Sequence, residues 1–395
     1  MAVRVTVAQR RARLGVRHRL ATRAGTPEEV AGALVALHAT DPATVYLSTA
    51  ARLREPSVAE VERALYDDRT LLRMLCMRRT MFVLPVAVAA RAQAGAALDV
   101  ERKQRTLLIS HLSSQGHPDN VPGAAEWLAE TEEATLRALR ARGQATGAEL
   151  SAEVPRLRQQ LIMAKGKPYE AIGNVTSRVL YLLGLRGRIV RGRPRGSWLS
   201  SQYHWATLDT WLPGGLPELD PVTARTELAR HWLTSFGPAP VSDLRWWTGW
   251  TAAQTKQALA ALDLAEADLD GEPGVLLAGD TEPVPEPEPW VALLPALDPT
   301  PMGWQRRDWF LDGHQAALFD RSGNAGPTVW ADGRVVGGWA QRADGEVVTR
   351  ILSDVGAEVT RAVEAEAARL TAWLGEVRVT PRFRTPLEKE LSGNP

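Results

Sequence analysis

Two segments of this chain repeat one pattern, a helix, a tight turn and a second helix, and this repeat constrains the fold more than any other feature. Leu139–Leu150 and Leu233–Leu244 each contain a Gly-x-Ala turn and an acidic residue directly before the final leucine. A glycine allows the positive φ at which many helices end, and a small alanine lets the next helix pack closely. Each copy predicts the first half of a helix-turn-helix. A third copy is indicated at Arg17–Leu37, where Thr26 and Pro27 open a helix.

A predicted recognition helix follows each of the first two copies. It spans Asn174–Gly184 in one copy and Thr251–Leu262 in the other, with Asn174 and Thr251 as the N-caps. After the first comes Arg186–Trp198, whose short β-prone pieces are separated by glycine and proline and carry many arginines. This composition is typical of a wing, a short hairpin whose tip meets phosphate.

The sequence changes in character after the proline- and glutamate-rich stretch Pro283–Pro289, which predicts a stiff linker or loop. Beyond it, short apolar segments separated by Asp-Gly or Gly-Asn turns predict strands. One amphipathic helix, Ala357–Leu374, follows, and Gly375 stops it. We therefore expect a small β-rich domain, closed into a barrel, at the end of the chain. Its predicted strands are Trp290–Leu294, Thr328–Ala331, Arg334–Ala340 and Glu346–Ile351.

Composition bounds the possible functions. A chain of 395 residues with 45% hydrophobic and 24% charged residues is expected to form about two to four globular modules. The single cysteine, Cys76, allows no internal disulfide and no cysteine-based zinc cluster. The sequence shows no signal peptide and no membrane span, so a cytoplasmic protein is expected.

Arginine dominates the basic residues, since only five of the 47 are lysines, while the net charge is +1. Arginine suits bidentate phosphate contacts. A genome rich in GC would produce the same bias, so composition alone does not identify a nucleic-acid-binding protein.

Familiar catalytic motifs are absent from the sequence. It contains no Walker loop, no Gly-x-Ser-x-Gly elbow, no His-Glu-x-x-His and no histidine–cysteine metal spacing. Nucleotide hydrolysis, serine hydrolysis and zinc chemistry are therefore not favoured, and we expect neither a metal nor a cofactor.

The segment Leu34–Pro42 places three polar residues, His38, Thr40 and Asp41, where an apolar helix stops. Near a helix end these side chains can point into one cleft. Alternatively, Thr40 or Asp41 caps the next helix, predicted over Pro42–Arg52, and His38 is a hydrogen-bonded core histidine.

Other polar clusters allow two interpretations each. The strand-like run Arg69–Pro85 either brings arginines to a DNA groove or forms a buried strand with solvated ends. Tryptophans at 198, 205, 246, 247 and 250 could stack on bases, although core packing is more common for most of them. The proline-rich turns Asp298–Trp304 and Arg382–Pro386 either line a site or tie the last domain to its neighbours.

Taken in order along the chain, several of these segments resemble one bacterial family of winged-helix DNA-binding proteins, whose characterised members are DNA glycosylases of the AlkZ and YcaQ type. The resemblance runs from about residue 8 to the C-terminus. The segments that carry it are His38–Pro42, Ala51–Leu53, Met77–Pro85, Ser197–Ser201, Ala296–Trp304 and Gly337–Trp339.

This resemblance implies an α+β fold of three tandem winged helices and a C-terminal β-barrel, which together form a concave cradle around duplex DNA. The expected divisions are residues 1–125, 126–212, 213–285 and 286–395. It also implies excision of N7-alkylated purines, including bulky adducts and interstrand crosslinks made by antibiotics. A monomer associated with the nucleoid is expected.

The sequence departs from the family at its catalytic motif. The family has Gln-x-Gln, or Gln-x-Asp in the YcaQ branch, whereas the matching positions here are His38 and Thr40. Both side chains can still donate and accept hydrogen bonds, and histidine adds the capacity of a general base. His38 is expected to orient or deprotonate the hydrolytic water, and Thr40 to complete its hydrogen bonding. Asp41 would stabilise the sugar cation or cap a helix.

Because no lysine lies near His38 to form a Schiff base, water is the expected nucleophile and the enzyme would be monofunctional. A transcriptional regulator and a lesion binder without catalytic activity are the alternatives. The arginines expected to contact DNA are Arg52, Arg78, Arg79, Arg188, Arg191, Arg193, Arg195, Arg382 and Arg384.

Overall fold

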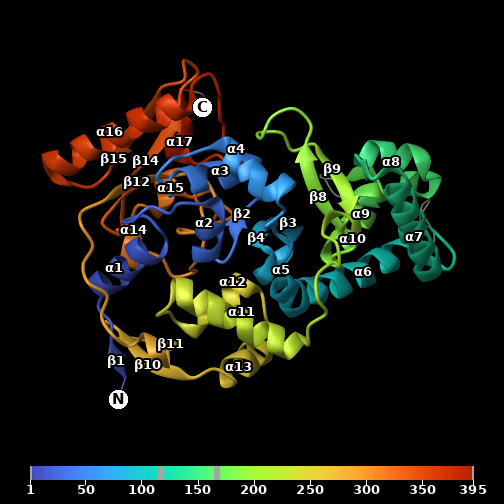
Figure 1. The fold of residues 1–395 in the computed structure, drawn as a ribbon, viewed down its shortest axis with the longest axis horizontal. Coiled ribbons are helices and arrows are strands. Elements are labelled where there is room, and N and C mark those ends of the chain that lie inside the picture. The colour runs from blue at the N-terminus through green and yellow to red at the C-terminus, as the bar shows by residue number, and fades with distance from the viewer. Residues whose placement is uncertain (1, 114–119, 164–169, 394–395) are drawn as a thin grey trace.

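One order of elements occurs three times in this protein: a helix, a single short strand, two further helices and a two-stranded hairpin. The computed structural model describes residues 2–113, 120–163 and 170–393. In each repeat the single strand pairs with the second strand of the hairpin. Figure 1 shows the second repeat (green) at one end of the molecule, the C-terminal sheet at the other, and the first repeat between them.

The first repeat confirms the predicted helix start at Thr26 and Pro27. Thr26 caps its first helix by accepting a hydrogen bond from Glu29 N, and Pro27 is the first helical residue. Its sheet has the order β2-β4-β3 and is antiparallel. The elements are α2 (Pro27–Ala33), β2 (Leu37–His38), α3 (Pro42–Ala50), α4 (Val58–Glu62) continued by a π-helical turn (Arg63–Asp67), β3 (Leu71–Leu75), a 3-10 turn (Met77–Arg79) and β4 (Met81–Pro85).

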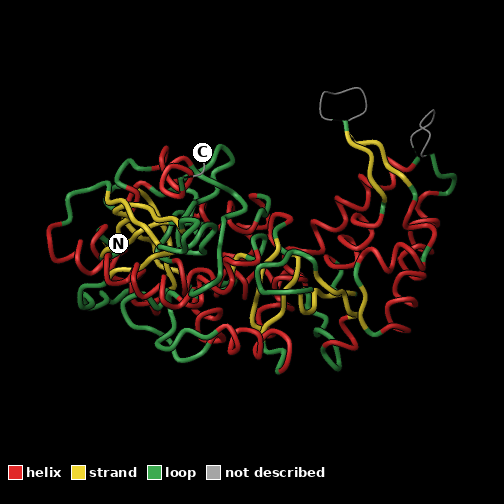
Figure 2. The backbone as a smooth tube through the Cα atoms, turned by 90° about the horizontal axis from the view of Figure 1, so that it is seen from above, coloured by secondary structure: helices red, strands yellow, loops and turns green. Residues whose placement is uncertain are grey.

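The second repeat ends in a hairpin at the place of the predicted wing, and its sheet has the order β5-β9-β8. An extra hairpin, β6 (Gln160–Met163) and β7 (Ala171–Asn174), is inserted before the predicted recognition helix and projects from the body in Figure 2. The predicted cap at Asn174 is wrong, because Asn174 pairs with Gln160 in this hairpin and the helix begins at Thr176. The other elements are α7 (Ala124–Arg142), β5 (Gln144–Ala145), α8 (Gly147–Glu153), a 3-10 turn (Pro155–Arg158), α9 (Thr176–Leu185), β8 (Ile189–Pro194) and β9 (Tyr203–Thr207).

The third repeat confirms the predicted cap at Thr251, which forms a capping box with Gln254. Gly237 differs from expectation, since its φ is −76°. Glycine is needed there for space, because a Cβ would lie 2.4 Å from the carbonyl oxygen of Leu233. The elements are α11 (Pro221–Phe236), α12 (Val241–Thr248), α13 (Ala252–Ala260), β10 (Leu264–Leu269), β11 (Glu272–Leu277) and a 3-10 turn (Ala278–Asp280); Ala239 bridges to Val275, and β1 (Val3–Arg4) extends the other edge of the sheet.

The C-terminal strands form an open sheet, so the expected closed barrel is wrong. They are antiparallel in the order β12-β13-β14-β15, and the two outer strands do not pair with each other. Helix α16 packs against both outer strands and α17 against β14. Helix α16 therefore covers the two outer strands, β12 and β15, which would have to pair with each other in a closed barrel. The elements are β12 (Val291–Leu294), α14 (Asp308–Leu311), α15 (Gln315–Leu318), β13 (Thr328–Ala331), β14 (Arg334–Gln341), β15 (Val347–Ile351), α16 (Gly356–Leu374) and α17 (Pro386–Ser392).

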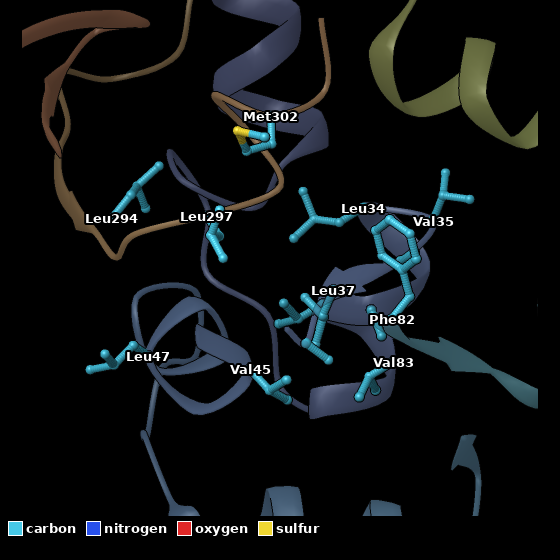
Figure 3. Close-up of a cluster of buried hydrophobic side chains, with 14 of the residues drawn as sticks. Leu34, Val35, Leu37, Val45, Leu47, Phe82, Val83, Leu294, Leu297 and Met302 are labelled. Carbon is cyan, nitrogen blue, oxygen red and sulfur yellow. The ribbon is translucent and has the colours of Figure 1, made fainter. Parts of the chain in front are cut away.

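Three hydrophobic clusters hold these parts together. The largest joins the first repeat, the third repeat and the C-terminal sheet, and residues of the second repeat such as Leu185 and Val190 also belong to it. The next lies within the second repeat and α6, and a small third one packs β1 against the hairpin β10–β11. Figure 3 shows Leu37 and Val45 of the first repeat near Leu297, which comes from the C-terminal region. The remaining helices are α1 (Val7–Arg17), α5 (Val86–Ala92), a π-helical turn (Gln93–Ala97), α6 (Leu98–Leu112) and α10 (Leu208–Trp211).

Most of the tryptophans for which the sequence allowed either base stacking or core packing belong to these cores. Trp198, Trp247 and Trp250 are buried, as the core interpretation predicted, while Trp205 and Trp246 are half-buried. Cys76 is also fully buried. Burial raises the pKa of its thiol above the usual range, which makes it a packing residue.

Candidate active site

The segment from His38 to Asp41 connects strand β2 to helix α3 and lies over the largest hydrophobic cluster. Asp41 is the N-cap of α3, and its Oδ1 accepts a hydrogen bond of 3.1 Å from Ala43 N. Its Oδ2 accepts one of 2.8 Å from the backbone N–H of Arg382. Both carboxylate oxygens are therefore held by backbone donors, and Asp41 has the capping role that the sequence offered as one of two interpretations.

His38 lies in strand β2, opposite Phe82 of β4, and its ring meets the Phe82 ring nearly edge-on at 5.5 Å. Only 7% of the residue is exposed. Burial, and then the nearby charge of Arg78, lower the pKa of His38 to about 3. The imidazole is therefore neutral near pH 7 and is a weak base, so it is better suited to orienting a water than to removing a proton from it.

Thr40 lies beside this ring and is half-exposed. Its backbone N–H points to Nδ1 of His38 at 3.5 Å, the outer limit for a hydrogen bond. Nδ1 is the acceptor in this contact. The hydroxyl of Thr40 makes no hydrogen bond within the described part of the chain. The Thr40 hydroxyl therefore remains available, directly after β2, both to donate and to accept a hydrogen bond.

The turn between β3 and β4 brings Arg78 near His38, whereas Arg79 lies over the ring of Tyr181 on α9. Both residues have a left-handed backbone, with φ of 51° and 68°. The Arg78 guanidinium lies 4.1 Å from the centre of the Trp246 ring on α12, and burial lowers its pKa to about 10. Gly249 leaves room for this side chain, because a Cβ there would lie 2.8 Å from Cγ of Arg78. Arg79 is exposed.

Arg52 does not contact solvent, so its expected role in DNA binding is wrong. Its side chain is completely buried and pairs with Asp298 through two hydrogen bonds of 2.7 and 2.8 Å. Its remaining donors reach Thr300 Oγ1 and the carbonyl oxygens of His18 and Ser48. The pair instead fastens the turn at 298–304 to the first repeat, the second of the two interpretations given for that turn.

His18 extends this buried network toward the third repeat. Its Nδ1 lies 2.9 Å from Thr300 Oγ1 and its Nε2 lies 3.1 Å from the carbonyl oxygen of Ser235. Burial, and then the charge of Arg52, lower the pKa of His18 to about 3. Sequence reasoning missed this histidine, because its partners come from segments more than 200 residues away.

The remaining expected DNA contacts fall into two groups. Arg188, Arg193 and Arg384 form ion pairs with carboxylates of the chain, at Glu133, at Glu62 and Asp67, and at Glu388 respectively. Arg195 and Arg382 are exposed, whereas Arg191 is half-buried between the rings of Tyr203 and Trp205.

Residues 2–113, 120–163 and 170–393 contain no group of three or more His, Cys, Asp or Glu side chains placed to hold a metal ion. Within the same residues, no helix is both long and apolar enough to cross a lipid bilayer.

Comparison with known proteins places this chain in one family. The model of the AlkZ-like DNA glycosylases matches residues 31–373. The structure is similar to that of the Streptomyces sahachiroi DNA glycosylase AlkZ, with a TM-score of 0.70 and 22% sequence identity over 96% of this chain and 99% of that one. No curated protein sequence matches. The structural similarity establishes the fold, and the match to the family model covers most of the chain, so this protein belongs to the AlkZ-like DNA glycosylase family.

Proposed function

We propose that this protein is a monofunctional DNA glycosylase that hydrolyses the N-glycosidic bond of N7-alkylated purines in duplex DNA. The observation that carries the proposal is the neutral, buried imidazole of His38 beside the half-exposed Thr40, next to the Arg78–Arg79 turn. The family match supports glycosylase activity, and the chemistry of the segment supports water as the nucleophile.

The reaction needs little from these side chains. An N7-alkylated guanine already carries a positive charge, so its bond to the sugar breaks without protonation of the base. The protein has to position a water and stabilise the developing sugar cation. His38 and Thr40 would hold that water, and the carboxylate of Asp41, fixed by Ala43 and Arg382, would contribute negative charge nearby.

The three repeats would supply the DNA-binding surface. Their shared strand order is that of winged helices, and we assign all three to that class. One monomer would enclose one duplex at the nucleoid through exposed arginines such as Arg79, Arg195 and Arg382. Bulky adducts fit poorly into an extrusion pocket, so excision without complete base flipping is proposed.

The test is release of base from a duplex oligonucleotide that carries N7-methylguanine, with a bulky N7-guanine adduct in parallel. His38→Ala and Thr40→Val should each lower the rate about 100- to 1,000-fold, the usual cost of losing one such group. His314→Ala is the matched control, because this half-buried histidine bonds Ser353 in the C-terminal region.

Two results would contradict the proposal. Tight binding to both substrates without release by the wild type would leave a lesion binder. A palindromic footprint on undamaged DNA would indicate a regulator.

A further inference from the structure

Two arginines without acidic partners, one buried and one half-buried, face each other where the first repeat meets the second. Arg73 on β3 is 2% exposed, and its Nε and Nη1 have no hydrogen-bond partner. Arg191 on β8 lies across from it, also with an unpaired Nε. Neither guanidinium has a carboxylate within ion-pair distance among the described residues. Both lie over the ring of Tyr203, at 4.9 and 5.2 Å from its centre.

Three tyrosine hydroxyls lie close to the Arg73 guanidinium, and none has a hydrogen-bond partner of good geometry. They belong to Tyr46 on α3, Tyr66 in the π-helical turn after α4, and Tyr203 on β9, and each of these residues is at most 6% exposed. Tyr66 makes only weak contacts, with Arg73 and with Tyr46. The same small region therefore holds two cations and three hydroxyls whose hydrogen-bonding capacity the protein leaves partly unused. Burying such groups unpaired is unfavourable, and each one in a native protein calls for an explanation.

The charges around this cluster do not neutralise it. Burial, together with the positive charges of Arg73 and Arg382, lowers the pKa of Arg191 to about 10. The carboxylate of the candidate catalytic segment is that of Asp41, whose charge, after burial, helps to raise the pKa of Tyr203. Both of its oxygens are already held by backbone N–H groups. Glu62, on the far side, pairs with Arg193. An anion from outside the chain is therefore the missing partner.

We propose that Arg73, Arg191 and the hydroxyls of Tyr46, Tyr66 and Tyr203 form a binding site for one phosphate group of the DNA backbone. Guanidinium forks match the oxygens of a phosphate, and the tyrosine hydroxyls would donate to the same oxygens. Half-buried Arg191 and Trp205 leave one side of the cluster accessible.

The position of the site indicates which phosphate of the DNA would bind there. Arg382 and Asp41 connect the cluster to the segment of His38 and Thr40, so the phosphate bound here is one that flanks the nucleotide whose base is released. This assignment rests on the proposed function. Inorganic phosphate offers the same oxygens, and the experiment below separates the two sources.

The experiment measures binding to a duplex that contains a tetrahydrofuran analogue of an abasic site, which has no base to release. Each phosphate on either side of the analogue is replaced in turn by a neutral methylphosphonate. The variants are Arg191→Met, Arg73→Met and Tyr203→Phe. Arg69→Met is the control, since Arg69 is a half-buried arginine on the same side of the repeat that lies over Trp211 and donates to its carbonyl oxygen.

We expect Arg191→Met and Arg73→Met to weaken binding about tenfold at low salt and to reduce the slope of log K against log salt by about 0.9, the value for one lost phosphate contact. Tyr203→Phe should weaken binding about fivefold and leave the slope unchanged, because it removes a hydrogen bond and no charge. One methylphosphonate position should weaken the wild type and leave the Arg191→Met variant unaffected. Arg69→Met should bind as the wild type does.

Equal binding by the wild type, Arg191→Met and Tyr203→Phe at every salt concentration would overturn the proposal, even where Arg73→Met does not fold. An increase in Tm on adding inorganic phosphate that Arg191→Met abolishes, with DNA binding unchanged in all variants, would also overturn it in favour of a free anion. Because the duplex contains no glycosidic bond to cleave, a failure to release bases would contradict the proposed function and leave this result untouched.

Discussion

The backbone N–H of Arg382 donates a hydrogen bond of 2.8 Å to Oδ2 of Asp41, and the two residues are 341 positions apart in the sequence. The same carboxylate caps helix α3 through Ala43 N. The C-terminal segment therefore fixes the start of α3, directly after the residues of the candidate active site. The position of His38 and Thr40 depends in this way on a part of the chain that the family motif does not include.

Asp41→Ala should lower the free energy of unfolding by about 1–2 kcal/mol, because it removes the helix cap and leaves Arg382 N without its acceptor. It should also slow base release by at least tenfold, because the segment that ends at Asp41 would no longer be held in place. Urea unfolding and base release measured on the same preparation check the two effects. Full activity in the destabilised variant would contradict the second expectation.

Asp298→Ala should destabilise the protein by about 3–5 kcal/mol, because it leaves the buried guanidinium of Arg52 uncompensated. Urea unfolding measures this loss. Arg52→Lys, which keeps the charge opposite Asp298, should cost less. A loss in Asp298→Ala no larger than that in Arg52→Lys would contradict this account of the pair.

Acid should destabilise this protein through two histidines. The pKa values of His18 and His38 in the folded state are about 3, below the ordinary value of 6.5, so the unfolded chain binds more protons than the folded one. Their contribution to stability is complete above pH 6.5 and is lost as the pH falls toward 3, at about 1.4 kcal/mol per pH unit for each histidine. In urea unfolding between pH 7 and pH 4, His18→Gln should show a shallower decline than the wild type. Parallel curves would show that His18 does not contribute.

His38→Gln should retain base release within about tenfold of the wild-type rate, whereas His38→Ala should lose 100-fold or more. The reason is that a neutral imidazole and a carboxamide both donate and accept hydrogen bonds, so either can orient a water. Single-turnover rates on the N7-methylguanine duplex make the comparison. A glutamine variant as slow as the alanine variant would indicate that the ring has a role that a hydrogen-bonding group of another shape cannot replace.

Local signals in the sequence predicted local structure well. The caps at Thr26 and Thr251, the helix that ends at Leu374 and the four C-terminal strands were all predictable, because neighbouring residues determine them. The cap at Asn174 failed because an inserted hairpin takes up the backbone of that residue. The barrel failed because strand segments show no sign of whether their outer edges pair or are covered by a helix.

The candidate site was less predictable than the fold. His38, Thr40 and Asp41 were found together because they are adjacent in sequence. Arg52 was wrongly assigned to DNA binding. Its partner Asp298 lies 246 positions away in the sequence, and the identity of a residue as arginine does not show whether its side chain is buried. The missing partners of Arg73 could not be foreseen for the same reason: an unsatisfied donor is a property of the packed structure.

The burial of the Arg52–Asp298 pair has a consequence for how the protein can be divided. The strand pairing of the repeats and of the C-terminal sheet would allow each to be a separate unit. The first repeat, however, supplies Arg52 and the sheet region supplies Asp298 to one buried ion pair. A fragment that ends before residue 286 would keep a guanidinium in its interior with no counter-charge, and would expose the apolar residues of the largest hydrophobic cluster. The first repeat, the third repeat and the sheet therefore share one core and are expected to unfold together, and the second repeat is joined to them through residues such as Leu185 and Val190, although it also has a core of its own with α6.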